Sequence, residues 1–349
     1  MRRVLVVLLA LLAIPATTSS SPAQRASDLH SRDALLGWMW SYRAKPDPAS
    51  VPAAMRAASR IGLFQNTENA GVFVGFMAGV IAANPKAAKG IIEKTLPLPT
   101  EDQWFMVRAI AYSGAPQWRA LLRDVADKLP ARRVMIDKHV ADELPTLEHL
   151  DLKDDPKWYA KAWETIRIDR YFRAPPPKEH RLEPSPDLID TLWGYHLATG
   201  AYAPVARLIS ILPWVKDRDN ADRLALGAMA KYTLALNASR SPQILDLLRW
   251  AVTQRHRDGA VPQLKEVIDA AETADTVRLR REALAAIEDL KRRGPYYRRN
   301  VAWWGQMGES AIALGCLGAA ITGQVQFGLP CVLGGALTSA GLRWWATQE

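Results

Sequence analysis

The sequence predicts an all-α protein. Period-2 alternation of β-branched residues, the usual mark of strands, is almost absent, and no Asn-Gly or Asp-Gly hairpin turn lies between such residues. Apolar residues at helical spacing are abundant instead, and they are interrupted by Gly, Asn and Pro at the places where helices end. Four segments also share one pattern of helix, break and helix, which indicates helical hairpins.

Each of these hairpins is predicted from a short polar or glycine break between two apolar-periodic runs. The breaks lie at 84–85 within 73–96, at 114–116 within 103–129, at 200–204 within 188–212 and at 237–242 within 224–252. Asn or Gly supplies a left-handed residue at the end of the first helix, and proline starts the second. The breaks are unevenly spaced, so we expect an irregular, solenoid-like α-hairpin array rather than a regular repeat.

After the hairpins, the periodicity from Leu264 to Leu290 predicts one long amphipathic helix that ends at Gly294-Pro295. Its charged face is expected to be solvated. Prolines crowd the segment 174–186, which is expected to be an extended linker. This divides the chain into an N-terminal helical-hairpin region (28–173), the linker (174–186), a second hairpin region (187–300) and a glycine-rich apolar hairpin (301–349).

Residues 1–23 have the pattern of a signal peptide. Arg2 and Arg3 precede an uncharged apolar run, Val4 to Ile14, and Ser21-Pro22-Ala23 offers small side chains for cleavage after Ala23. An uncleaved N-terminal anchor is the alternative, although the run is short for a membrane span. We therefore expect an exported protein of the periplasm or cell envelope.

Positive charge is concentrated near the C-terminus. The chain carries a formal net charge of +9, which falls to +7 when Arg2 and Arg3 leave with the signal peptide. Five of the remaining excess cations lie together without an intervening acid: Lys291, Arg292, Arg293, Arg298 and Arg299. The rest of the chain is nearly balanced, so a nucleic-acid partner is not expected.

The segment from Ser310 to Leu342 has no charged residue. Cations precede it and aromatic residues flank it on both sides, as is typical of membrane association: Trp303, Trp304, Trp344 and Trp345. Three arrangements fit: a single span, a helical hairpin that dips into a membrane, or a hairpin buried in the protein. Gln324 and Gln326 near the centre disfavour the span.

The two cysteines, Cys316 and Cys331, would lie one on each arm of such a hairpin. In an oxidising compartment an even pair of this kind predicts a disulfide. Two buried free thiols are the alternative.

Three short motifs resemble a group of exported bacterial proteins that combine a signal peptide, an irregular helical body and a glycine-rich apolar C-terminus. They are Leu192–Gly200, Ala83-Asn84-Pro85 and Ala111-Tyr112-Ser113-Gly114. The resemblance covers most of the mature chain and implies an organisation, without an activity that can be carried over.

No motif predicts a catalytic, cofactor-binding or metal site. The densest group of possible metal ligands surrounds Pro145, but its members are expected to be a solvated face and a loop: His139, Asp142, Glu143, Glu148 and His149. His196, which lies among aromatic residues, could line a pocket or simply pack in the core.

These observations favour a non-enzymatic interaction or scaffold protein, without a cofactor, that meets a membrane surface or a protein partner through its basic, aromatic and glycine-rich C-terminus. The alternative is an exported helical hydrolase or lyase acting on an envelope polymer or polysaccharide, because carboxylate-based glycosidases carry no short signature. Such an enzyme predicts a deep cleft lined by carboxylates and aromatic residues. A third possibility is a self-assembling glycine-zipper element, which predicts oligomers.

Overall fold

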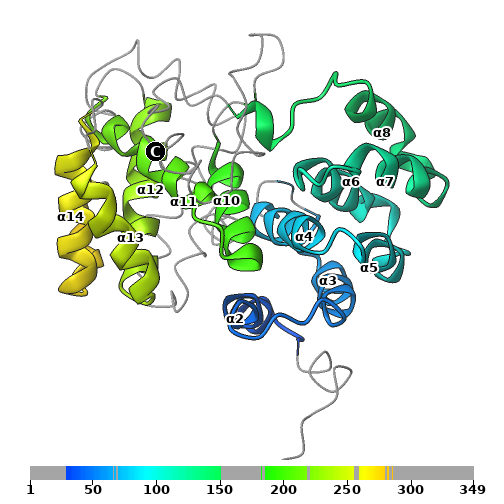
Figure 1. The fold of residues 1–349 in the computed structure, drawn as a ribbon, viewed down its shortest axis with the longest axis horizontal. Coiled ribbons are helices and arrows are strands. Elements are labelled where there is room, and N and C mark those ends of the chain that lie inside the picture. Colours follow the sequence, from blue (N-terminus) through cyan, green and yellow to red (C-terminus); the bar gives the residue numbers. More distant parts are fainter. Residues whose placement is uncertain are drawn as a thin grey trace, which may run out of the picture.

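The computed structural model describes residues 29–150 without 66, 68 and 69, residue 182, and residues 185–285 without 218–220, 255–258, 280, 283 and 284. This part of the chain contains helices and no strands, so the all-α prediction is confirmed for it (Figure 1). The α-helices are α2 (Arg32–Tyr42), α3 (Val51–Arg60), α4 (Gly71–Ala83), α5 (Ala88–Thr95), α6 (Gln103–Tyr112), α7 (Trp118–Val125), α8 (Arg133–Val140), α10 (Pro186–Thr199), α11 (Ala203–Ser210), α12 (Ala221–Ala238), α13 (Pro242–Thr253) and α14 (Ala260–Glu272).

The helices that the hairpin pattern predicted are present at all four places, but the breaks are built differently from one another. Gly114 and Gly200 adopt the expected left-handed conformation, with φ of 61° and 69°. Asn84 does not: its φ is −127°, and its side chain instead donates a hydrogen bond to the carbonyl of Val80. Asn237 belongs to α12 rather than to the break, where its amide likewise donates to Thr233, four residues earlier.

The long helix predicted for 264–290 is wrong as a single element. Helix α14 ends at Glu272, Ala274 has a positive φ of 55°, and helical structure resumes at residue 276. The Asp275 side chain accepts a hydrogen bond from the Arg278 amide, as an N-cap does. Arg278 then forms an ion pair with Asp269 of α14 at 2.9 Å. This ion pair joins the charged residues on the two sides of the break.

Helix α4 lies at the centre of the described body. Its sequence, GVFVGFMAGVIAA, is apolar on every side, and its residues from Gly71 to Ile81 are buried. A helix that is hydrophobic all round needs neighbours on all sides. It contacts α10, α6 and α5, and the helices follow one another along the long axis in the order α14, α12, α11, α10, α4 and α6, with α7 and α8 together at the far end (Figure 1).

The contact between α4 and α10 is unusually close. Gly71, Gly75 and Gly79 recur every four residues and so lie on one face of α4, where they meet the backbone of α10. A methyl group added at Gly75 would lie 1.9 Å from the carbonyl oxygen of Thr191. On the opposite side, a methyl at Gly194 would lie 2.0 Å from the carbonyl oxygen of Val72. The two helices therefore touch backbone to backbone.

This pairing joins the two predicted helical regions, since α4 comes from one and α10 from the other, and both contribute to one hydrophobic core. In a simple solenoid each hairpin packs on the next in sequence, whereas α10 packs chiefly on α4. The solenoid-like arrangement of the whole chain stays a prediction.

The signal peptide and the apolar hairpin 301–349 lie outside the described residues, as does most of the linker 174–186.

Candidate functional site

The site residues predicted from the sequence fall beyond the described part of the chain. This holds for the five cations from Lys291 to Arg299, for the four flanking tryptophans and for the pair Cys316 and Cys331. Their roles stay predictions, and the candidate sites of the described body are its hollows and its clusters of titratable side chains.

The residues of the histidine cluster around Pro145 make contacts that stabilise the fold. His149 Nδ1 accepts a hydrogen bond from the Thr146 amide at 3.0 Å and closes a helical turn. Asp142 forms an ion pair with Arg119. His139 is buried, and burial, aided by the nearby Arg108, lowers its pKa to about 4. Among the described residues, no group of three or more His, Cys, Asp or Glu could hold a metal ion.

A pocket of about 300 Å³ opens where α2, α10 and the start of α13 meet. We call it the basic pocket, because its described lining holds two arginines and no carboxylate. Its lining residues are Trp40, Arg43, Ala44, His196, Leu197, Arg240, Ser241, Gln243 and Ile244.

His196 holds Arg43 in place within the basic pocket. The imidazole Nδ1 lies 2.7 Å from the carbonyl oxygen of Ala201, so it must carry the proton and donate. Its Nε2 then accepts from the Arg43 guanidinium, at 3.3 Å. The ring is 1% exposed, and this burial lowers the pKa of His196 to about 4, with Arg43 acting in the same direction and the Ala201 bond opposing it. The histidine is therefore a neutral acceptor at physiological pH.

Two further features shape this pocket. Arg240 follows the end of α12, and partial burial lowers the pKa of its guanidinium, with Tyr232 acting in the opposite direction. Ser241 caps α13: its hydroxyl accepts from the Ile244 amide at 3.4 Å and donates to the Gln243 side chain at 3.0 Å. The amino end of α13, which carries a partial positive charge, thus forms part of the pocket wall.

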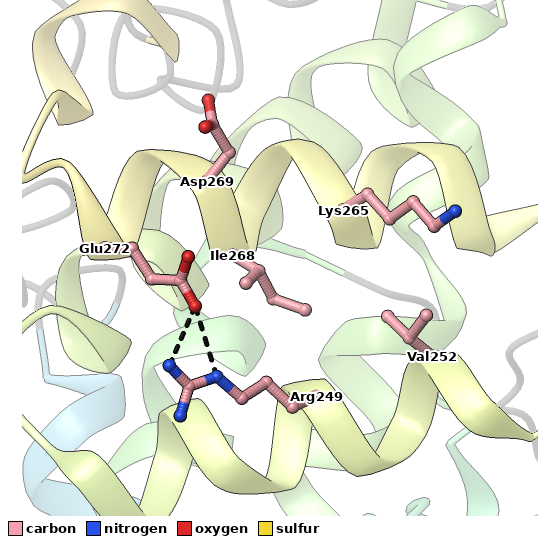
Figure 2. Close-up of a pocket in the computed structure, with 6 residues that line it drawn as sticks. All are labelled: Arg249, Val252, Lys265, Ile268, Asp269 and Glu272. Atoms are coloured by element: carbon pink, nitrogen blue, oxygen red, sulfur yellow. Dashed lines mark hydrogen bonds and ion pairs between the residues drawn. The ribbon is translucent and has the colours of Figure 1, made fainter.

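A second hollow, of about 280 Å³, is a groove between α13 and α14 (Figure 2). Figure 2 shows Ile268 and Val252 directed into the groove, while Arg249 and Glu272 reach across it toward each other. Those two groups form an ion pair at 2.8 Å, and Asp269 pairs with Arg278. The charges of this groove are thus largely neutralised within the protein.

Neither hollow matches the cleft that a helical hydrolase or lyase requires. Among the described lining residues, the basic pocket has an aromatic residue but no carboxylate, and the groove has two ion-paired carboxylates but no aromatic residue. In the described part of the chain, no helix has both the length and the apolar character needed to cross a bilayer.

His196 was the one residue of the basic pocket that the sequence singled out, and the structure shows it both buried in the core and facing the pocket. The sequence did not mark Arg43 and Arg240 as binding residues, since an arginine just after a helix is a common cap.

No family model matches the chain, and no curated protein or solved structure is significantly similar to it.

Proposed function

We propose that this protein is a non-enzymatic scaffold of the bacterial cell envelope, and that its basic segment, Lys291 to Arg299, binds it to an anionic membrane surface. The structural observation behind the proposal is the place of α14. That helix forms one end of the row of helices, at the opposite end from α8 (Figure 1). In the chain, the described residues that follow α14 end at residue 285, and the basic segment begins at residue 291.

The charge distribution also supports membrane binding through the basic segment rather than through the described body. In the described body, cations are matched with carboxylates in many ion pairs, among them Arg119 with Asp142 and Lys231 with Glu266. The five cations of the basic segment have no acid among them in the sequence. Each cation held near an anionic bilayer contributes about 1 kcal/mol to binding, an interaction that salt weakens.

Flotation of the full-length protein with lipid vesicles tests the proposal. Wild-type protein should float with vesicles of phosphatidylcholine and phosphatidylglycerol, should float poorly with phosphatidylcholine alone, and should be released by high salt. A variant with glutamine at Lys291, Arg292, Arg293, Arg298 and Arg299 should remain in the soluble fraction.

A matched control removes the same number of charges from the described body. It carries glutamine at five exposed cations that form no ion pair in the structure: Arg60, Lys86, Lys94, Arg123 and Lys138. This control should float like the wild type. Flotation of the first variant at the wild-type level, or failure of the wild type to bind anionic vesicles, would overturn the membrane proposal. The second outcome would leave a protein partner to be sought by crosslinking.

Export and the disulfide belong to the same proposal. The mature protein recovered from the periplasm should begin at Gln24, and non-reduced protein should resist thiol alkylation at Cys316 and Cys331. Intact mass after alkylation, with and without a reductant, measures both properties.

A further inference from the structure

Several arginines of the described body form an ion pair with a carboxylate, whereas no described carboxylate pairs with Arg43. Arg119 pairs with Asp142, Arg223 with Asp217, and Arg249 with Glu272, at distances of 2.8 to 3.2 Å. The Arg43 guanidinium instead donates to the neutral imidazole of His196. A neutral acceptor fixes the direction of the guanidinium without cancelling its charge. Arg43 can therefore still attract an anion from solution.

The surroundings of Arg43 limit how far it can turn away. Gly200 lies beneath its side chain, because a methyl group added there would be 3.1 Å from Arg43 Cδ. Gly200 has a φ of 69°, which favours glycine at this position. Its amide donates to the His196 carbonyl at 2.7 Å, so the turn that supports Arg43 also ends the helix that carries His196. The guanidinium is thus held in position before any ligand arrives.

Other lining residues of the basic pocket add positive potential and neutral hydrogen-bonding groups. They are Arg240 and the residues at the amino end of α13, among them Ser241 with its hydroxyl and Gln243 with its amide. Two guanidinium groups and a helix amino end in one hollow, with no carboxylate among its described lining residues, favour a group such as a carboxylate or phosphate. The planar guanidinium of arginine can donate two parallel N–H hydrogen bonds to two oxygens of a carboxylate or a phosphate.

The apolar part of the lining indicates what the anionic group is attached to. Trp40, Leu197 and Ile244 supply aromatic and aliphatic surface beside the charged groups. A volume of about 300 Å³ is at the small end of the range for ligand pockets, enough for a single ring with its substituent.

We propose that the basic pocket binds a small organic anion, a carboxylate or phosphate carried on an apolar ring, with the anionic group between Arg43 and Arg240 and the ring against Trp40. This site has none of its described lining residues in the proposed membrane-binding segment. It would make the protein a scaffold that also senses or carries a small acidic molecule. Loss of vesicle binding would not affect it.

Isothermal titration calorimetry with full-length protein tests the proposal, using phenyl phosphate, benzoate, inorganic phosphate and the neutral probe benzamide. Phenyl phosphate or benzoate should bind, benzamide should not, and inorganic phosphate should bind more weakly than phenyl phosphate. Binding of phenyl phosphate without benzoate would identify a phosphate ligand, and the reverse a carboxylate ligand. Absence of binding by both ring-bearing anions would overturn the proposal.

Substitutions assign the binding to this pocket. Arg43→Gln should weaken binding of the ring-bearing anion roughly ten- to hundredfold, because a hydrogen bond to a charged group is lost. Arg43→Lys, which keeps the charge and removes the fork, provides a second reading if the glutamine variant folds poorly. Trp40→Leu should weaken phenyl phosphate binding and leave inorganic phosphate binding unchanged.

The control is Arg123→Gln, which removes an exposed arginine outside the pocket and should bind every probe like the wild type. Equal affinity of the Arg43 and Arg123 variants for the ring-bearing anion would place the binding elsewhere and overturn the assignment. Circular dichroism of each variant, compared with the wild type, confirms that the helical fold is retained.

Discussion

Gly75 of α4 lies directly against the carbonyl of Thr191 in α10, so close that a single added methyl group would be 1.9 Å from that oxygen. Backbone on one side faces backbone on the other, and neither can move without shifting a whole helix. This contact fixes the distance between the two central helices.

The first prediction concerns this contact. Gly75→Ala should destabilise the protein by about 3 kcal/mol or more, because the clash cannot be relieved by a side-chain rotation. The matched control is Gly90→Ala in the exposed part of α5, where an added methyl group meets nothing within 4 Å. Alanine favours a helix over glycine, so the control should be stabilised by about 0.5–1 kcal/mol.

Urea unfolding followed by circular dichroism measures both variants. Equal stability of Gly75→Ala and wild type would show that α4 and α10 are not in backbone contact.

The second prediction concerns pH. His139 and His196 are buried, and their pKa values fall from 6.5 to about 4 in the folded protein. Between these values the unfolded chain binds more protons than the folded one, so stability is full above pH 6.5 and declines as the pH falls. Each histidine should reduce the free energy of unfolding by about 2 kcal/mol between about pH 7.5 and pH 5.

His139→Gln isolates one of these contributions. The difference in stability between about pH 7.5 and pH 5 should be smaller in the variant than in the wild type by about 2 kcal/mol. Asp190, whose pKa is raised by burial, acts in the opposite direction, but it is present in both proteins and cancels in the comparison. An identical pH dependence in the two proteins would show that His139 is not buried in its neutral form.

The third prediction concerns Lys231, whose side chain is only 10% exposed and contacts Glu266 of α14 and Glu282 beyond the break, at 2.5 and 3.3 Å. Lys231→Met keeps the apolar stem but leaves two carboxylates close together without their shared cation. We expect a loss of about 1–2 kcal/mol, because the glutamates are partly solvated.

Lys89→Met serves as the control for this substitution. Lys89 forms a single ion pair with Asp124 at 2.8 Å, and both side chains are largely exposed, so the thermal midpoint should stay at the wild-type value. Thermal unfolding compares the two variants, and equal midpoints for both would contradict a role for Lys231 in attaching α14.

The failure of the long-helix prediction shows where local patterns stop being sufficient. Apolar spacing continues smoothly from Leu264 through Val277, and no glycine or proline marks the break. The helix ends because Asp275 can cap a new turn and because Arg278 can reach back to Asp269. The second of these is a contact across the break, which the periodicity of a single face does not encode.

The glycine spacing of α4 is a signal that the sequence contained. Gly71, Gly75 and Gly79 recur every four residues in an apolar helix, a pattern that allows close helix packing. The pattern identifies the face that is packed, yet it does not identify the partner. Gly194 of α10 completes the contact, more than a hundred residues later in the chain.

The sequence by itself determined the helical class and the positions of the four hairpins, because helix periods, caps and breaks depend on residues a few positions apart. Only the tertiary structure decided that α4 pairs with α10, because that choice depends on which two surfaces fit without a side chain between them. Together with the contacts of α2 on α10 and of α13 on α12, this pairing brings Arg43, His196 and Arg240 to one hollow. Residues from three distant segments meet there, and no local pattern could have joined them.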